Sequence, residues 1–464
     1  MTQRLRPFLT VILVAGAGLL STTAPATAQD SHYWTLQYGP RSSLLGGAVI
    51  GSVDDVSATF YNPGALSLAS DLAFAVSADV FEVTGVILEG GGGEGVDLGN
   101  SKSGLRPSLI AGTLKRGLLG GGGVLAYSAL TRARGTQDLA GAALLSGEDL
   151  RPELDLQDAV GGVAFTGRFD DFWGGLTYSQ ALGEHFGLGV TWYGAVRSQE
   201  RRREAIGQLI NTDGSGSSEI DISGGSYTAY RTLFKLGGSF ATGPITGGLT
   251  LTTPSIQLGG SGDLSFNQSA FGTDTVALAA SVQPDLSATY KSPLSVGAGL
   301  AWRIGGARLH GSLEWFDAIA PYFVMQGEDV PAQEPPDQII PVDAVQEQDE
   351  VLNWALGLEY AFTPKVSAYL SYYTDNSTLT DEVERAGLGV LPFNISNVNV
   401  GTDFVVKSAQ PEASVRIRVG KQGGPESDGP AARAGSRLRG HLRVPQPEAS
   451  VRIRDRGGLS LGVR

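Results

Sequence analysis

The sequence predicts an all-β fold, a transmembrane antiparallel β-barrel of about 14 strands that encloses an N-terminal hatch (plug) segment. Three observations lead to this prediction. Large apolar residues recur at every second position over stretches of about ten residues, the length with which a tilted strand crosses a bilayer. Tight turns alternate with long polar connections. Finally, the chain begins with an export signal, and no later stretch approaches twenty apolar residues.

Residues 1–28 are expected to be a signal peptide. Arg4 and Arg6 precede an apolar run over residues 8–20, and Ala26 and Ala28 provide the small residues of a cleavage site. The apolar run is too short for a helix that spans a bilayer. An exported chain without such a helix is either soluble or a closed outer-membrane barrel, because both satisfy the backbone hydrogen bonds.

The alternation is strongest over residues 351–362. The large residues of that stretch occupy every second position, and small or polar residues stand between them, so a strand would place the two sets on opposite faces. An apolar face with aromatic residues near its ends fits lipid, and a small or polar face fits a wet lumen. The large set comprises Leu352, Trp354, Leu356, Leu358, Tyr360 and Phe362.

The connections favour a barrel over a soluble β-sandwich. Tight turns at 183–185, 241–244, 305–306 and 363–365 alternate with long polar segments at 197–225, 254–294, 317–350 and 376–393. Outer-membrane barrels place short turns on the periplasmic side and longer loops outside. Strands are expected near 72–82, 105–115, 123–131, 172–182, 186–196, 226–240, 245–253, 295–304, 307–316, 351–362, 366–375, 394–406, 414–419 and 458–463.

Composition excludes several classes of function. The chain has no Cys, so disulfides, thiolate metal sites and cysteine nucleophiles are absent. A net charge of −13 argues against nucleic-acid binding, because phosphate contacts need surplus Lys and Arg. The four His residues show no metal-ligand spacing, so no metal and no cofactor is expected. His310 leaves a barrel lipid hydrolase as an alternative, since a serine and an acid from other strands could join it. We expect no catalytic residues and no enzymatic activity.

Residues 29–70 are expected to form the hatch. They are apolar enough to pack but too few to fold alone, so the barrel lumen is the natural place for them. Leu44, Leu45, Phe60 and Tyr61 are the candidate packing residues. The run Asn62-Pro63-Gly64 is a turn signal, because Pro fixes φ and Gly tolerates positive φ.

This segment resembles one known family. Gly-Gly-Ala at 46–48, Asp-Asp at 54–55 and Ser-Ala-Thr-Phe-Tyr-Asn-Pro at 57–63 look like the hatch of FadL-type long-chain fatty acid transporters. The family's barrels have fourteen strands and a hatch with an Asn-Pro-Ala motif. Asn62 and Pro63 match the motif, and Gly64 stands where Ala is usual. The rest of the barrel, 71–419, resembles the family by architecture alone.

The resemblance implies a location and a function. The chain would lie in the cell outer membrane and take up hydrophobic small molecules passively, through the hatch and a lateral opening in the wall. Fatty acids and aromatic hydrocarbons are both ligands within the family. The expected partners are such a ligand, outer-membrane lipid, lipopolysaccharide and the barrel-assembly machinery, and the chain is expected to be a monomer. A structural or adhesive barrel that binds a surface partner, and a soluble exported β-protein, are the further alternatives.

Three arginines are candidate contacts for a ligand carboxylate. Arg106, Arg132 and Arg308 fall on or near expected strands, and a guanidinium pairs well with a carboxylate. The same arginines would also pair with lumen carboxylates or with lipopolysaccharide phosphates, which is the interpretation that the sequence favours because lumen charges are common.

The C-terminal tail, residues 420–464, differs from the rest of the chain. It is basic, and Gln410–Arg418 (QPEASVRIR) recurs at Gln446–Arg454. Family barrels end in an aromatic residue on the last strand, whereas this chain ends in Val463-Arg464. Our hypothesis is that the tail reflects an altered reading frame or a duplication.

Sequencing the encoding DNA tests this hypothesis about the tail. A frameshift or duplication should separate the two QPEASVRIR copies. An intact single reading frame that is shared with close relatives would contradict it.

Overall fold

The fold is known from a computed structural model, which describes residues 32–69, 72, 74–88, 98–119, 122–146, 156–272, 276–335, 338–364, 366–379, 394–404 and 413–422. These residues confirm the all-β class. They form one 15-stranded antiparallel sheet and two small two-stranded sheets. The expected signal peptide, most of the basic tail and the last expected strand, 458–463, lie outside the described residues.

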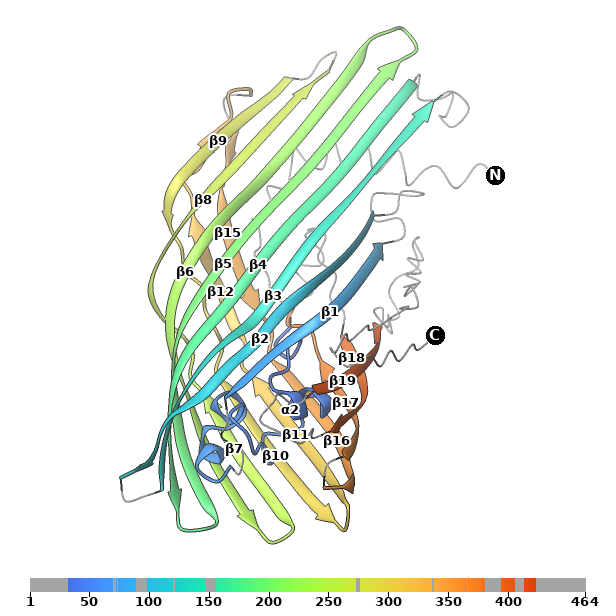
Figure 1. Ribbon diagram of the computed structural model, residues 1–464. Helices are drawn as coiled ribbons and strands as arrows, with labels where there is room; N and C mark the ends of the chain where they lie inside the picture. The colour runs from blue at the N-terminus through green and yellow to red at the C-terminus, as the bar shows by residue number, and fades with distance from the viewer. Residues whose placement is uncertain are drawn as a thin grey trace, which may run out of the picture.

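The main sheet follows chain order. Neighbouring strands pair antiparallel in the order β1 (Ala75–Leu88), β2 (Leu98–Leu118), β3 (Gly123–Ser146), β4 (Leu156–Leu182), β5 (Phe186–Asn211), β6 (Gly216–Thr242), β7 (Ile245–Thr252), β10 (Ser295–Ile304), β11 (Ala307–Phe316), β16 (Val351–Thr363), β17 (Val366–Asp375), β18 (Ile395–Phe404) and β19 (Ala413–Gln422). The sheet curls around the N-terminal segment, which lies in its lower part (Figure 1). Every expected strand up to 414–419 has a counterpart in this series.

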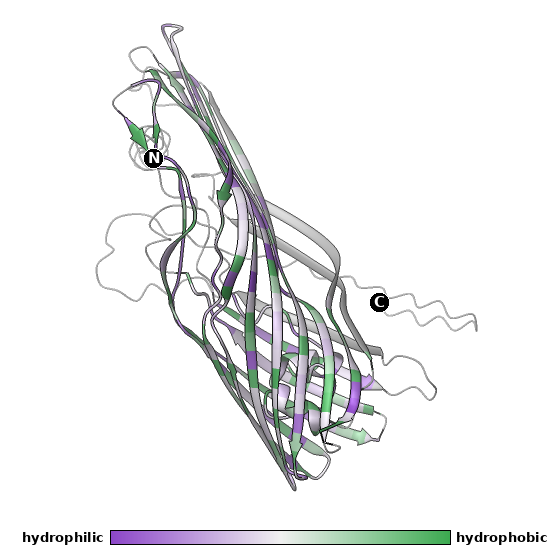
Figure 2. Cartoon of the chain, turned by 90° about the vertical axis from the view of Figure 1, so that its left-hand side faces the viewer, coloured by the Kyte–Doolittle hydropathy of each residue, from purple (hydrophilic) through white to green (hydrophobic). Residues whose placement is uncertain are grey.

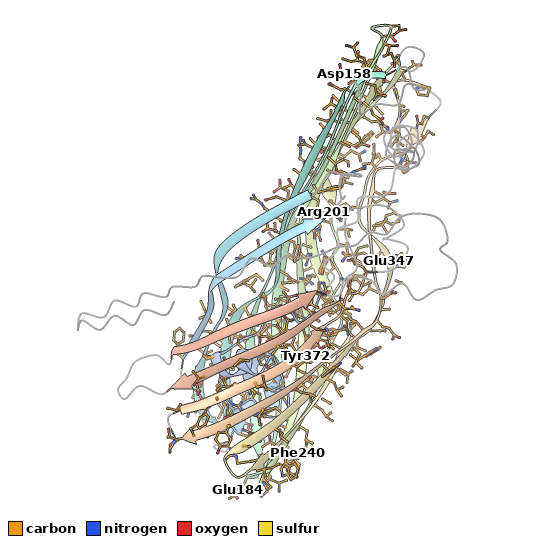
Figure 3. All side chains as sticks on the ribbon, turned by 90° about the vertical axis from the view of Figure 1, so that its right-hand side faces the viewer. Asp158, Glu184, Arg201, Phe240, Glu347 and Tyr372 are labelled. Carbon is orange, nitrogen blue, oxygen red and sulfur yellow. The ribbon has the colours of Figure 1, made fainter. Side chains whose placement is uncertain are left out.

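Tight turns gather at the lower end. Gly183, Gly243 and Gly305 stand at three of them with φ of 71°, 53° and 60°. This backbone conformation is open to Gly and strained for other residues. Figure 3 places Glu184 at this end, with Phe240 close above it and Asp158 at the far tip of the long strands.

Three of the four long polar connections were predicted wrongly as loops. Residues 197–225 are mostly strand, because β5 and β6 continue as one hairpin up to the pair Ile210↔Gly216. Residues 254–294 hold β8 (Ile256–Phe271) and β9 (Val276–Ser287), and 317–350 hold β12 (Ile319–Gln326), β13 (Val330–Pro331), β14 (Ile339–Ile340) and β15 (Asp343–Gln348). The backbone ladder needs no apolar side chains, so it continues where the alternation that marks a strand has ended. Of the segment 376–393, only 376–379 are described.

The two faces of the strands follow the sequence alternation. In β16, Asn353 and Ala355 are buried while Leu352, Trp354 and Leu356 are exposed. Apolar and polar residues also alternate along the strands of the lower half in Figure 2. The lower sheet therefore presents an exposed apolar band on the outside and its small or polar residues on the inside, as a bilayer and a wet lumen require.

The segment inside the barrel is built from short helical turns. These are α2 (Pro40–Leu44), α3 (Ala58–Tyr61) and the 3-10 helix η1 (Pro63–Ser67). None of the helices in the described part of the chain is long and apolar enough to cross a membrane. We call residues 32–69 the hatch from here on.

Inward-facing glycines on the wall receive the hatch. They are Gly187 and Gly189 on β5, Gly237 on β6, Gly248 on β7 and Gly299 on β10, and we call them the glycine seat. A Cβ atom at any of them would overlap hatch atoms, among them Gly64 O, Pro63 O, Asn62 Oδ1, Asn62 Nδ2 and Gly51 N. Because these contacts involve hatch backbone and a buried amide, the hatch lies directly on the strand backbones. Part of the high Gly content of the chain serves this contact.

We expect Gly299→Ala to loosen the hatch. The added Cβ would overlap the backbone at Gly51, and overpacking of this kind costs about 1–3 kcal/mol. Limited proteolysis should then cut near Arg41 faster than in the parent protein. Gly194→Ala is the matched control, since a Cβ there meets nothing within 4 Å. Equal cleavage of the two variants would contradict the close contact between the hatch and the glycine seat.

Candidate functional site: the hatch and the chamber above it

Asn62 lies at the centre of the contact between hatch and wall. Its side chain is fully buried, and its Oδ1 accepts a hydrogen bond from Gly64 N at 3.0 Å, which caps η1. Its Nδ2 donates to Ile50 O at 3.0 Å and to Gly238 O on β6 at 3.1 Å. One amide thus joins two parts of the hatch and fixes both to the barrel.

The geometry explains the glycine in the hatch motif. A Cβ at Gly64 would lie 2.6 Å from Gly237 O and 2.7 Å from Gly187 O. An alanine, which the FadL-type motif has here, would not fit this seat without a shift of backbone.

The candidate packing residues divide between the hatch interior and the chamber. Leu44, Leu45 and Tyr61 are buried in one apolar cluster, and Phe60 packs against it. Tyr61 accepts a hydrogen bond from Tyr38 N at 2.9 Å and donates to Gln37 Oε1 at 2.8 Å. Phe60 instead contributes its ring to the wall of the chamber described below.

An ionic latch ties the hatch to β11 and β16. Arg41 donates to Glu359 Oε2 through Nη2 at 2.7 Å and through Nε at 3.1 Å. His310 Nε2 lies 3.3 Å from the same oxygen, and its Nδ1 lies 2.8 Å from Ser52 Oγ in a hydrogen bond. Burial lowers the pKa of Arg41, but the nearby carboxylates of Asp54 and Glu359 outweigh it and hold that pKa above its usual range.

The latch brings together a serine, a histidine and an acid. Ser52, His310 and Glu359 have the residue types of a hydrolase triad, the alternative that His310 left open. The Ser52 and His310 side chains are buried, however, and Glu359 is held by Arg41. Neither the aromatic chamber above the hatch nor the apolar groove on the outer face includes any of the three. The arrangement therefore anchors the hatch to β11 and β16.

A second anchor holds the N-terminal end of the hatch. The carboxylate of Asp375 at the end of β17 accepts hydrogen bonds from Tyr33 N (3.1 Å), Trp34 N (2.8 Å) and Thr35 Oγ1 (2.8 Å). Trp34 Nε1 also donates to Glu314 Oε2 on β11 at 2.9 Å. The N-terminal end of the hatch and the latch at Arg41 and Ser52 are thus attached to neighbouring strands on one side of the barrel.

Above the hatch lies a small chamber of aromatic rings and charges. Its cavity measures about 40 Å³, so it holds water but no larger ligand in this conformation. The guanidinium of Arg132 lies 5.7 Å from the ring centroids of Phe60 and Trp173. Lys235 lies 4.7 Å from the ring of Phe60, on the other side of the chamber.

Two buried arginines lie behind residues that line the chamber. Arg231 donates to Asp171 Oδ1 at 2.5 Å and lies 4.5 Å from the ring of Tyr290, and Arg197 lies 4.3 Å from the same ring. Aromatic faces attract cations, and the effect strengthens where water is excluded. The chamber therefore offers flat apolar surfaces together with positive charge.

The ladder between β2 and β3 is interrupted beside this chamber. β2 and β3 pair from Leu109↔Leu130 down to the lower turn and again at Gly99↔Ala140, with no paired residues in between. Both strands are irregular at the lower end of this gap, since the register shifts past Ser108 against β1 and past Arg132 against β4. Such bulges bend a strand and redirect its side chains. Residues 100–108 and 131–139 thus border an opening in the ladder.

The three candidate arginines lie in different places. Arg132 lines the chamber, beside the gap. Arg308 instead donates to Thr246 Oγ1 at 2.9 Å and lies 4.0 Å from Asp54, next to the latch. Arg106 lies in the stretch of β2 that does not pair with β3, and on the other side it pairs with Asp79 of β1. Its side chain is outside the described part of the structure.

Sequence reasoning missed Arg231 and Lys235. Both share the inward face of β6 with Leu233, and all three are buried. Positions 231, 233 and 235 are spaced by two, so they share one face of the strand, and the other face is largely apolar. This pattern is a signal that could have placed the two cations in the lumen. Within the described residues, no group of three His, Asp or Glu is placed to hold a metal ion.

Comparison with known proteins finds likeness in fold alone. No protein-family model matches the chain, and no curated protein matches its sequence. Among solved structures, the CymD monoaromatic hydrocarbon channel is 11% identical with a TM-score of 0.49, covering 83% of this chain and 93% of its own. A Pseudomonas aeruginosa FadL homologue is 11% identical with a TM-score of 0.48 over 84% and 91% of the two chains. The Pseudomonas putida toluene transporter TodX is 13% identical with a TM-score of 0.42 over 83% and 91%.

We expect Glu359→Gln to weaken the latch. The change keeps the shape of the side chain and removes the charge that Arg41 and His310 face. A partly buried pair of this kind is worth about 1–3 kcal/mol as a charge-assisted hydrogen bond, so the hatch should unfold at a lower denaturant concentration than the barrel. Hydrogen exchange at residues 41–53 measures this. Glu200→Gln, an exposed change on β5, should leave the exchange unaltered.

Proposed function

We propose that the protein is a passive outer-membrane channel for hydrophobic small molecules, gated by the hatch and releasing its cargo sideways. The observation that carries the proposal is the gap between β2 and β3 beside the chamber. A hydrophobic molecule that leaves through the wall reaches the lipid without crossing water, which its apolar surface favours.

The distribution of apolar residues supports the membrane location. Exposed Leu, Phe and Trp side chains cover the outside of the lower strands, while the same strands are polar or small inside. A soluble protein rarely exposes so extensive an apolar surface. The signal peptide over residues 1–28 and assembly by the barrel-assembly machinery belong to the same proposal.

The proposed route begins at the end with long strands and ends at the gap. The hatch fills the lower lumen, so cargo cannot continue along the barrel axis. The chamber is too small for cargo in this conformation, so the side chains of Arg132 and Phe60, or the hatch around Asn62–Gly64, must move. The latch and the Asp375 anchor limit that motion to the side of the hatch away from β11, β16 and β17.

The chemistry of the chamber suits long-chain fatty acids once the chamber has widened. The rings of Phe60 and Trp173 suit an apolar body, and Arg132 or Lys235 suits a carboxylate. Lys235 also lies 3.7 Å from Glu314. Arg132 lines the chamber beside the gap, and we propose that it faces the ligand carboxylate. The channel would act as a monomer, in contact with lipid and lipopolysaccharide and without cofactor or catalysis.

One observation favours a second candidate function. The hairpin of β5 and β6 extends well beyond the length that a bilayer requires, up to Ile210↔Gly216. This projecting sheet would suit a structural or adhesive barrel that binds a surface partner. In that case uptake of hydrophobic compounds would be independent of the chain.

A disulfide across the gap tests the proposed route. The chain has no Cys, so Ser103→Cys with Thr136→Cys adds a single pair, at positions that would face each other if the β2–β3 ladder were continuous. Oxidation should stop most uptake of radiolabelled oleate in cells that lack other uptake routes, and a reductant should restore it.

The control disulfide joins positions that are already paired. Ala111→Cys with Ser128→Cys lies below the gap and should leave uptake unchanged on oxidation. Full uptake by the oxidised Ser103/Thr136 variant would refute the lateral route. Uptake that is equal with and without the protein would favour the adhesive barrel.

A further inference from the structure

The outer face of the barrel carries a large apolar groove that is separate from the chamber. Its cavity measures about 850 Å³ and extends over β5, β6, β7, β10, β11 and β16. Figure 3 shows Phe240, one of its lining residues, near the end with short turns. The groove therefore lies in the lower part of the exposed apolar band.

Strand register shows how the groove forms. One row of paired residues crosses the strands as Leu188, Gly238, Leu249, Ala298, Leu313 and Trp354. The next row is Phe186, Phe240, Gly247, Leu300, Gly311 and Leu356. Large and small residues alternate from Leu188 to Leu313 in the first row and from Phe240 to Leu356 in the second, and each row has one pair of large neighbours, Leu313 with Trp354 and Phe186 with Phe240.

The small residues form the floor of the groove. A Cβ at Gly238 would meet the Leu188 side chain at 3.5 Å, and one at Gly311 would meet Leu356 at 3.6 Å, which are ordinary contact distances on the outer face. Ala298 lies between the exposed residues Val296 and Leu300 on the same face. Gly247 adds no depth, because the Phe240 ring covers it. Leu188, Leu300 and Leu356 form the ridges, and more than half of each side chain is exposed.

No charged residue lines the groove, and nearly all of its lining is apolar. An occupant must therefore be apolar and come from the medium that the band faces, and it must be narrow and flexible enough to lie between leucine ridges. Such a chain exchanges lipid contacts for contacts with the floor and ridges, so close packing rather than removal from water would hold it there. A second copy of this barrel is the alternative occupant, and crosslinking between copies separates the two.

We propose that this groove is a binding site for one acyl chain of a membrane lipid. The site lies on the opposite side of the wall from the hatch: Gly238 forms part of its floor, and the carbonyl of the same residue accepts the hydrogen bond from Asn62. The inference uses only the membrane location from the proposed function and is independent of the cargo and its route.

Photolabelling of the full-length protein in liposomes tests the site. The probe is a phosphatidylethanolamine with a diazirine in its acyl chain, and labelled peptides are identified by mass spectrometry. Peptides with Leu300, Leu313 and Leu356 should be labelled several-fold more than peptides with Leu176 and Leu370, which are similarly exposed on the outer face but lie outside the groove. Equal labelling of the two sets would overturn the proposal.

Two variants separate a bound chain from lipid that merely surrounds the barrel. Ala298→Leu with Gly311→Leu fills the floor and should reduce groove labelling to the level of Leu176 and Leu370. Gly194→Leu adds the same side chain on β5, where a Cβ meets nothing within 4 Å, and should leave groove labelling high. Labelling that survives the filled floor, or crosslinks between two copies at these residues, would overturn the proposal.

Flotation with the liposomes separates failure of the membrane location from failure of the acyl-chain site alone. A folded protein that fails to float would refute the membrane location and with it the proposed function. A protein that floats and shows heat-modifiable mobility, yet is labelled uniformly, refutes the acyl-chain site alone.

Discussion

The contact between hatch backbone and strand backbone is the constraint on which the rest of the structure depends. At Gly187, Gly237, Gly248 and Gly299 the wall has no side chains, so the hatch lies against the sheet itself. Close packing of this kind leaves little room for gradual displacement, because interiors respond to added volume by shifting or by losing contacts. The hatch thus has one well-defined resting position, and Asn62 holds it there through hydrogen bonds to both sides.

The contacts that hold the hatch in this position differ from one side of the barrel to the other. Glu359 and Asp375 hold the hatch from β16 and β17, and Glu314 holds Trp34 from β11. Toward β3 the contacts include a hydrogen bond from the Tyr38 hydroxyl to Thr131 O at 2.9 Å and the packing of Arg132 over aromatic rings. The carboxylates that hold the hatch are thus on β11, β16 and β17, whereas on β3, beside the gap in the ladder, the guanidinium of Arg132 donates to Tyr33 O at 2.5 Å.

Much of the fold could be predicted from the sequence, for identifiable reasons. The outward set from Leu352 to Phe362 and the glycines at tight turns follow from sterics and solvation that act within one strand or one turn. The strands between 197 and 225 could not be found this way, because alternation disappears where both faces of a strand are polar. Asn62 was found through its turn chemistry, but its bond to Gly238 depends on a strand 176 residues away. The convergence of Ser52, His310 and Glu359 depends on three separate segments, and no pattern within any one of them reveals it.

The gap between β2 and β3 is closed at both ends in the same register, at Leu109↔Leu130 and at Gly99↔Ala140. On either side of the interruption the ladders stay paired, β1 with β2 and β3 with β4. Because the flanking pairs keep one register, separation of residues 100–108 from 131–139 requires no slip of one strand along the other. A deformation at this point is therefore confined to two strands and reverses without re-pairing.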